Sequence, residues 1–217
     1  MRYAELMRAL RSMGSEENVK GMARFGISSK GTLGIPVTEL RKLAKSIGKD
    51  QELSLKLWAS GIHEARILAS LIGEKDEVTE SQMEEWVKDF DSWDVCDGVC
   101  GNLFDKTPFA YEKAAEWSER EEEFVKRAGF VMMAELAVHD KEAGDDRFMG
   151  FLPMIEAKAG DGRNFVAKAV NWALRQIGKR NPKLRRAAIK TARRIGLSDQ
   201  GRARWIASDA LRELERT

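Results

Sequence analysis

Residues 163–195 read RNFVAKAVNWALRQIGKRNPKLRRAAIKTARRI. Apolar residues recur at helical spacing on both sides of Asn181-Pro182, a dipeptide that ends one helix and opens the next. The stretch therefore predicts two helices, over 163–178 and 183–195, joined by a short loop. The rest of the chain has the same character, because strand-like alternation is absent and only four prolines interrupt 217 residues.

About a dozen helices joined by short loops are expected along the whole chain. Ser15 is placed to cap the second helix, and Pro36 stands where another helix can begin. The predicted ranges are 2–12, 16–24, one helix that starts at Pro36, then 50–60, 62–73, 80–90, 93–104, 109–118, 122–139, 146–158, 163–178, 183–195 and 199–215.

Helix pairs recur at about 35–40 residues without a strict consensus, which is typical of a degenerate HEAT-like array. We therefore predict an all-α fold: a curved α-solenoid of HEAT-like helical repeats that forms a single domain over residues 1–217. Stacked helix pairs create a concave surface that suits a long ligand, such as a peptide, another protein or a nucleic-acid duplex. A compact helical bundle is the alternative architecture.

The composition excludes membrane-spanning and disordered classes. The chain is 43% hydrophobic and 33% charged, and no apolar run approaches the roughly 20 residues that span a bilayer. The N-terminal residues lack the apolar segment of a signal peptide. Cys96 and Cys100 lie four apart in one predicted helix, so we interpret them as small core residues and expect a reducing, cytoplasmic location.

The net charge of +2 hides an uneven distribution. Residues 161–217 hold 15 of the 37 Lys and Arg residues but only 5 of the 35 Asp and Glu residues, a balance of +10. The first 160 residues hold the other 22 and 30, a balance of −8. Such a basic end is suited to phosphates, although a solvated basic face on the last helices explains it equally well.

A second stretch, Asp91-Ser92-Trp93-Asp94-Val95-Cys96-Asp97-Gly98, places an aromatic ring beside a carboxylate. Trp93 and Asp97 are four positions apart, so on a helix they share one face. The ring face and the carboxylate both attract positive charge, which predicts a site for a cation. The structural alternative is a half-buried tryptophan next to a solvated aspartate.

Signals for conventional catalysis are scarce. The two histidines, His63 and His139, lie far apart, and no metal-binding or phosphate-loop motif is present in the sequence. Arg127 instead lies at the front of an otherwise apolar helix, and Trp172 and Arg175 share a helix face. For Trp172 the structural alternative is a core position with Arg175 as its exposed neighbour.

Taken together, these pieces resemble the AlkD-like DNA alkylation repair proteins, which are HEAT-like-repeat DNA glycosylases. The resemblance extends over most of the chain and depends on the order and spacing of several short motifs. They are Gly34-Ile35-Pro36 before Leu40-Arg41, His63-Glu64-Ala65-Arg66, Trp93-Asp94-Val95-Cys96-Asp97, Lys126-Arg127-Ala128, Asn171-Trp172-Ala173-Leu174-Arg175 and Asn181-Pro182.

The resemblance implies a role for each matching residue. Trp93 and Trp172 would contact the deoxyribose of a damaged nucleotide, Asp97 would be the catalytic carboxylate, and Arg127 would contact a phosphate. In the region that supplies a further aromatic residue in the family, this chain has Phe25. Arg175 would help to hold the backbone, and basic helix ends after Trp172 would neutralise phosphates: Lys179, Arg180, Arg185, Arg186, Arg193 and Arg194.

The implied function is excision of cationic N3- or N7-alkylated purines from duplex DNA. Asp97 would stabilise oxocarbenium charge on the sugar and position a water, and the base would leave neutral, so no cofactor, metal or general acid is needed. We expect a monomer that binds double-stranded DNA in a concave basic groove, with no membrane partner. The alternative is a non-catalytic HEAT-like module that binds DNA or a protein through the same groove.

Overall fold

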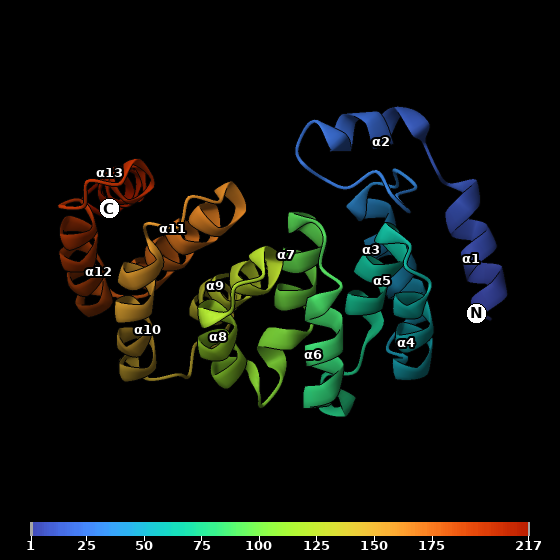
Figure 1. Cartoon of the computed structure of the whole chain (residues 1–217). Coiled ribbons are helices and arrows are strands. Elements are labelled where there is room, and N and C mark those ends of the chain that lie inside the picture. The colour runs from blue at the N-terminus through green and yellow to red at the C-terminus, as the bar shows by residue number, and fades with distance from the viewer. Residues whose placement is uncertain (1, 217) are drawn as a thin grey trace. The chain divides into compact units, whose positions relative to one another are not determined.

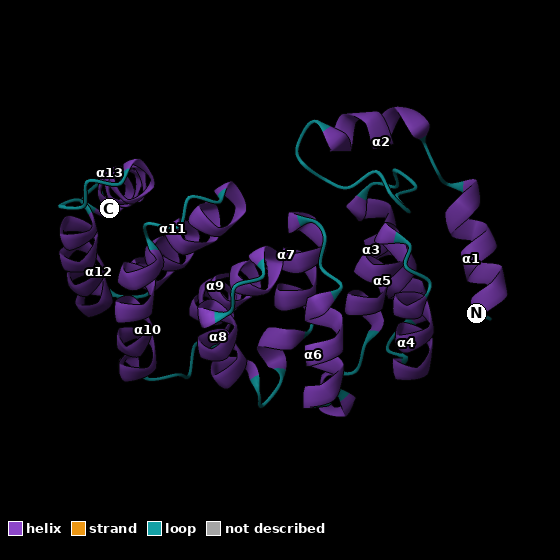
Figure 2. Ribbon diagram, viewed as in Figure 1, coloured by secondary structure: helices purple, strands orange, loops and turns teal. Residues whose placement is uncertain are grey.

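The computed structural model describes residues 2–216 of the chain (Figure 1). These residues form thirteen α-helices, two short 3-10 helices and loops, with no strand among them (Figure 2). The prediction of an all-α fold is therefore confirmed. The chain divides into two compact units, Met1–Thr107 and Pro108–Thr217, which are described separately below. That the two make one domain stays a prediction.

Unit 1 contains seven α-helices, and their ends agree closely with the predicted ranges. Ser15 caps the second helix as expected, because its Oγ accepts from the backbone N–H of Asn18 at 3.3 Å. The two 3-10 helices, Lys75–Glu77 and Phe104–Lys106, were not predicted. The α-helices are α1 (Tyr3–Ser12), α2 (Glu16–Ala23), α3 (Val37–Ile47), α4 (Gln51–Ala59), α5 (His63–Ile72), α6 (Glu80–Lys88) and α7 (Trp93–Asn102).

Helix α5 is the centre of unit 1, since it packs against α3, α4 and α7. The helices α4 and α6 stack beside each other through the parallel indole rings of Trp58 and Trp86, whose centroids lie 4.0 Å apart. Side chains that hydrogen-bond across neighbouring repeats are 31 residues apart in sequence, as for Gln51 with Gln82 and Trp58 with Asp89. The repeat of unit 1 is therefore shorter than the expected 35–40 residues.

Unit 2 contains six α-helices in two layers. Helices α9, α11 and α13 pack in sequence, and α8, α10 and α12 lie behind them. Here the paired side chains are 38 residues apart, as for Glu156 with Arg194 and Arg175 with Glu213, within the expected repeat length. The helices are α8 (Ala110–Glu119), α9 (Glu123–His139), α10 (Asp145–Lys158), α11 (Asn164–Lys179), α12 (Pro182–Ile195) and α13 (Gly201–Leu214).

Close helix packing in unit 2 depends on Gly129 of α9. A Cβ atom at this position would collide with the backbone nitrogen of Ser118 at the end of α8. Only glycine lets the two helices approach this closely, so their contact is fixed by backbone against backbone. In unit 1, Cys96 and Cys100 form no disulfide and are fully buried, which confirms that they are small core residues.

None of the helices in residues 2–216 has the length and apolar composition that crossing a bilayer requires.

Candidate functional site

Helix α7 presents Trp93 and Asp97 on one face, one turn apart, as predicted. The buried residues of this helix are Val95, Cys96, Val99 and Cys100. Trp93 and Asp97 are both half-buried, so each is anchored in unit 1 and still reaches the surface. The aromatic ring and the carboxylate therefore lie next to each other at the edge of the core.

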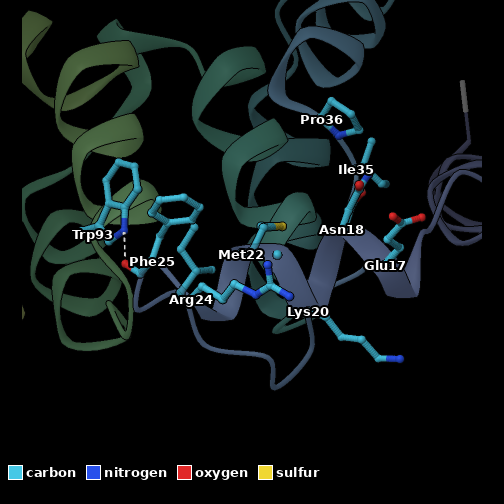
Figure 3. A pocket seen from close by; sticks show the side chains of 12 residues that line it. Glu17, Asn18, Lys20, Met22, Arg24, Phe25, Ile35, Pro36 and Trp93 are labelled. Carbon is cyan, nitrogen blue, oxygen red and sulfur yellow. Dashed lines mark hydrogen bonds between the residues drawn. The ribbon is translucent and has the colours of Figure 1, made fainter.

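The Trp93 indole is held by a residue that is 68 positions earlier in the chain. Its Nε1–H donates to the backbone carbonyl of Phe25 at 3.1 Å (Figure 3). The Phe25 side chain itself is 72% exposed. This bond restricts the plane of the indole, because rotation about χ1 or χ2 would break it.

A pocket of about 590 Å³ lies between helix α2, the segment that follows it and Trp93 (Figure 3). Its walls come from α2, from Phe25 and Ile27, and from the segment 34–36. Phe25, the aromatic residue of the N-terminal region, lines the same pocket as Trp93.

Glu64 of α5 holds one wall of this pocket in place. It is fully buried, and its carboxylate accepts from the backbone N–H groups of Leu33 (2.8 Å), Gly34 (2.6 Å) and Ile35 (3.2 Å). Gly34 has φ +81°, and a Cβ atom there would collide with the carbonyl oxygen of Ser15. The loop before α3 is therefore built around a carboxylate and a glycine.

His63, the residue before Glu64, holds α7 in the same way. Its ring Nε2 lies 2.8 Å from Oδ2 of Asp94, the neighbour of Trp93, and the histidine is buried. Burial alone lowers the pKa of His63, but the hydrogen bond and negative charge of Asp94 outweigh it and raise the pKa above its ordinary value. A cationic His63 is thus favoured where α5 meets α7.

The same helix carries Arg66, whose guanidinium donates to the side chain and to the carbonyl of Asp89, both at 2.9 Å. It also lies 4.9 Å from the centroid of the Trp58 ring. The motif His63-Glu64-Ala65-Arg66 therefore serves to position its neighbours. The partners of His63 and Glu64 were not predicted from the sequence.

In unit 2, Arg127 lies in the first half of α9 and is only 5% exposed. Its guanidinium donates to the backbone carbonyl of Phe165, just inside α11, at 2.6 Å. The residue therefore ties α9 to α11 in addition to any role toward a ligand. The apolar surroundings of Arg127 in the sequence were the signal for this burial.

Trp172 of α11 is half-buried and neither a core residue nor fully exposed. Near it on the same helix, Arg175 donates to the Glu213 carboxylate at 2.5 Å, and Lys179 forms an ion pair with the same group. Burial alone raises the pKa of Glu213, but these two cations outweigh it and lower the pKa below its ordinary value. Arg175 also lies 3.7 Å from the Asp209 carboxylate, so these two cations have two carboxylates beside them.

Three further predicted phosphate contacts also have partners inside unit 2, among them Arg193, which donates to the Glu215 carboxylate at 2.9 Å. Arg180 donates to the backbone carbonyls of Ala137 (2.9 Å), Asp140 (2.7 Å) and Ala143 (3.1 Å), so it holds the end of α9, and its contact with DNA stays a prediction. Arg194 forms a bidentate pair with Glu156, at 2.6 to 2.9 Å. A phosphate would have to compete with that carboxylate.

The structure thus brings Trp93 together with Asp97 in unit 1, and Trp172 with Arg175 and Lys179 in unit 2. In unit 1 these residues lie in the helix layer that contains α5 and α7. In unit 2 they lie in the helix layer that contains α9 and α11. That the two sets face one ligand stays a prediction.

Comparison with known proteins identifies the family. Residues 6–214 match the profile of the family described as "DNA alkylation repair enzyme". A search of curated protein sequences found no match.

Two solved structures are similar. The first belongs to "a new family of proteins related to the HEAT-like repeat DNA glycosylases with affinity for branched DNA structures"; it is 20% identical, with a TM-score of 0.83 over 100% of this chain and 95% of the other. This match confirms the HEAT-like helical fold. A designed armadillo repeat protein is 16% identical, with a TM-score of 0.37 over 82% and 92% of the two chains. Because the family profile extends over nearly the whole sequence, the chain belongs to the DNA alkylation repair enzyme family.

Proposed function

We propose that this protein is a DNA glycosylase that excises cationic N3- or N7-alkylated purines from duplex DNA. The observation that carries the proposal is the half-buried pair of Trp93 and Asp97 on one face of α7, in a chain of the DNA alkylation repair enzyme family. A carboxylate beside an aromatic face is what a developing sugar cation requires.

The chemistry requires few groups. An alkylated N3 or N7 purine is positively charged, so the electron pair of the C1′–N bond leaves with the base, which departs neutral. Positive charge then develops on the sugar as an oxocarbenium ion. Asp97 stabilises that charge and accepts a proton from the water that attacks C1′. Because the base leaves neutral, no general acid is needed at the leaving group. The two histidines of the sequence, His63 and His139, are accordingly not part of the pair Trp93 and Asp97.

The indole of Trp93 contributes through its orientation. Since Phe25 fixes its N–H, the ring is held before substrate arrives, and its π face attracts the sugar cation by about 0.5–2 kcal/mol. Trp172 is proposed as the second aromatic contact.

Unit 2 supplies the proposed DNA backbone contacts. Arg127 of α9 is proposed to contact a phosphate in addition to its bond to the Phe165 carbonyl. Arg175 and Lys179 of α11 are proposed as further phosphate contacts, where a phosphate would compete with Glu213 and Asp209. We propose that the protein acts as a monomer, without cofactor or metal.

The second candidate is a DNA-binding protein without glycosylase activity. It is favoured by the similar solved structure, which is of a protein described as having affinity for branched DNA. In that case the same aromatic and basic residues would hold DNA at a branch, and Asp97 would have no catalytic task.

The experiment that separates these functions is release of free base from methylated duplex DNA. The glycosylase proposal expects 3-methyladenine or 7-methylguanine to appear faster than by spontaneous depurination. The Asp97→Asn variant should release the base more slowly than the wild type. Asp91→Asn is its matched control, because Asp91 is an exposed carboxylate just before α7. Binding of a branched DNA at the spontaneous release rate would instead establish the second candidate.

A further inference from the structure

Helix α2 buries none of its residues, yet it is firmly placed in unit 1. The backbone N–H of Ser15 donates to Leu33 at 2.7 Å, and the Asn18 side chain donates to the Gly34 carbonyl at 2.9 Å. At the other end of the helix, Phe25 accepts from Trp93. The helix thus spans the 590 Å³ pocket without filling it, and this volume lies within the roughly 300–1,000 Å³ of ligand sites.

The lining of the pocket has an apolar part and a cationic part. Met22, Ile27, Ile35 and Pro36 supply apolar surface, and Trp93 and Phe25 supply aromatic rings at one end. Two exposed cations, four residues apart, also line the pocket: Lys20 of α2 and Arg24, which caps the C-terminal end of α2. Within residues 2–216, neither of these cations forms an ion pair.

The pocket has one anion in its lining. Glu17 lies in the first turn of α2, seven residues before Arg24, so about 10 Å separates them along the helix. Figure 3 shows Glu17 at the end of the lining away from Trp93 and Phe25. A phosphate is therefore attracted to the Arg24 end of the pocket, where the aromatic rings also lie.

We propose that this pocket binds the base of an unpaired nucleotide in DNA, with the adjoining phosphate on Arg24 and Lys20. The proposal rests on the DNA binding proposed above. A planar base matches an aromatic and apolar lining, and the phosphate matches the cations beside it. The exposed ring of Phe25 offers a face for stacking, while the indole N–H of Trp93 is already used. An apolar peptide would not use the two cations.

The test uses Gly21, which lines the pocket from α2. A Cβ atom there meets nothing within 4 Å, so Gly21→Leu extends into the pocket without a clash. Gly150→Leu is the matched control, because Gly150 is also helical, has equally open surroundings and lies in α10 of unit 2. The probes are a duplex with one bulged adenine, the same duplex with an abasic bulge, and the fully paired duplex.

Wild-type protein is expected to bind the adenine bulge about 10-fold more tightly than the abasic bulge, since only the former carries a base to stack. The Gly21→Leu variant should lose that difference and keep its affinity for the paired duplex. The Gly150→Leu variant should keep both. Phe25→Ala, which truncates an exposed side chain, should also reduce the difference and does not depend on the fold of the leucine variant.

Equal affinity of the wild type for the two bulges would overturn the proposal. A Gly21→Leu variant that still prefers the adenine bulge would also overturn it. If that variant kept the wild-type affinity for all three duplexes, the pocket would be one that binds protein instead of DNA. Base release from methylated paired duplex is measured on the same proteins. If the wild-type protein releases no base, the glycosylase proposal alone is refuted. If the wild-type protein binds none of the three duplexes, both proposals are refuted.

Discussion

Replacing Glu64 with glutamine should free the loop that leads into α3. In the native protein the carboxylate accepts from three backbone N–H groups, at 2.6 to 3.2 Å, in a fully buried position. Glutamine keeps one oxygen for two of these donors and turns an NH₂ group toward the third. One charge-assisted bond is lost and two become neutral, so the expected cost is about 3 kcal/mol.

The assay is hydrogen exchange of the backbone amides of Leu33, Gly34 and Ile35. A loss of about 3 kcal/mol in local stability corresponds to exchange that is faster by roughly 100-fold. Glu52→Gln is the control, because Glu52 is an exposed carboxylate on α4 and does not contact this loop; it should leave the protection of the three amides unchanged. Native protection in the Glu64→Gln variant would refute the role assigned to the carboxylate.

Three further outcomes are expected. Gly129→Ala should lower the free energy of unfolding by about 2 kcal/mol through overpacking, whereas Gly150→Ala should raise it by about 0.5–1 kcal/mol; equal effects in urea unfolding would contradict the packing described for α9. The raised pKa of His63 means that its pair with Asp94 contributes fully below about pH 6.5, the unfolded value, and that this stability is lost as pH rises through the folded pKa. When the pH is raised, the α5 amides should therefore exchange faster relative to an unfolded chain at the same pH. The Asp94→Asn variant should lack this pH dependence. If the pH dependence persists in the variant, the pair of His63 and Asp94 is not its source. Arg127→Ala should weaken DNA binding and reduce the salt slope by about one, and an unchanged slope would assign Arg127 a structural role, such as its bond to Phe165.

The helices could be predicted from the sequence because their limits are local. Ser15 and Asn181 cap their helices through their own side chains, at 3.3 and 2.9 Å, and the apolar periodicity between such limits is visible in any window of the chain. The shared face of Trp93 and Asp97 follows equally from helical spacing. The repeat length of unit 1 was overestimated, because loops obscure the repeat in the sequence. The 31-residue spacing becomes visible only in the structure, where Trp58 contacts Asp89.

The supports of the candidate site could not be predicted, because they join distant segments. Trp93 meets a backbone carbonyl 68 residues away, which no side-chain pattern records. Glu64 had a weaker signal: a carboxylate followed by a mostly apolar helix, in a chain with a glycine-rich loop. The structural partners of Arg180 were missed for a related reason, since its three carbonyl partners come from the end of α9 and the loop beyond it.

The most direct test of the central claim is the single-turnover rate of base release from a duplex with one 7-methylguanine, measured with wild-type protein and with Asp97→Asn at saturating enzyme. If Asp97 stabilises the sugar cation, the variant should bind the duplex with the same affinity and release the base about 100-fold more slowly. Equal release rates for the two proteins, or release by wild-type protein no faster than spontaneous depurination, would contradict the claim.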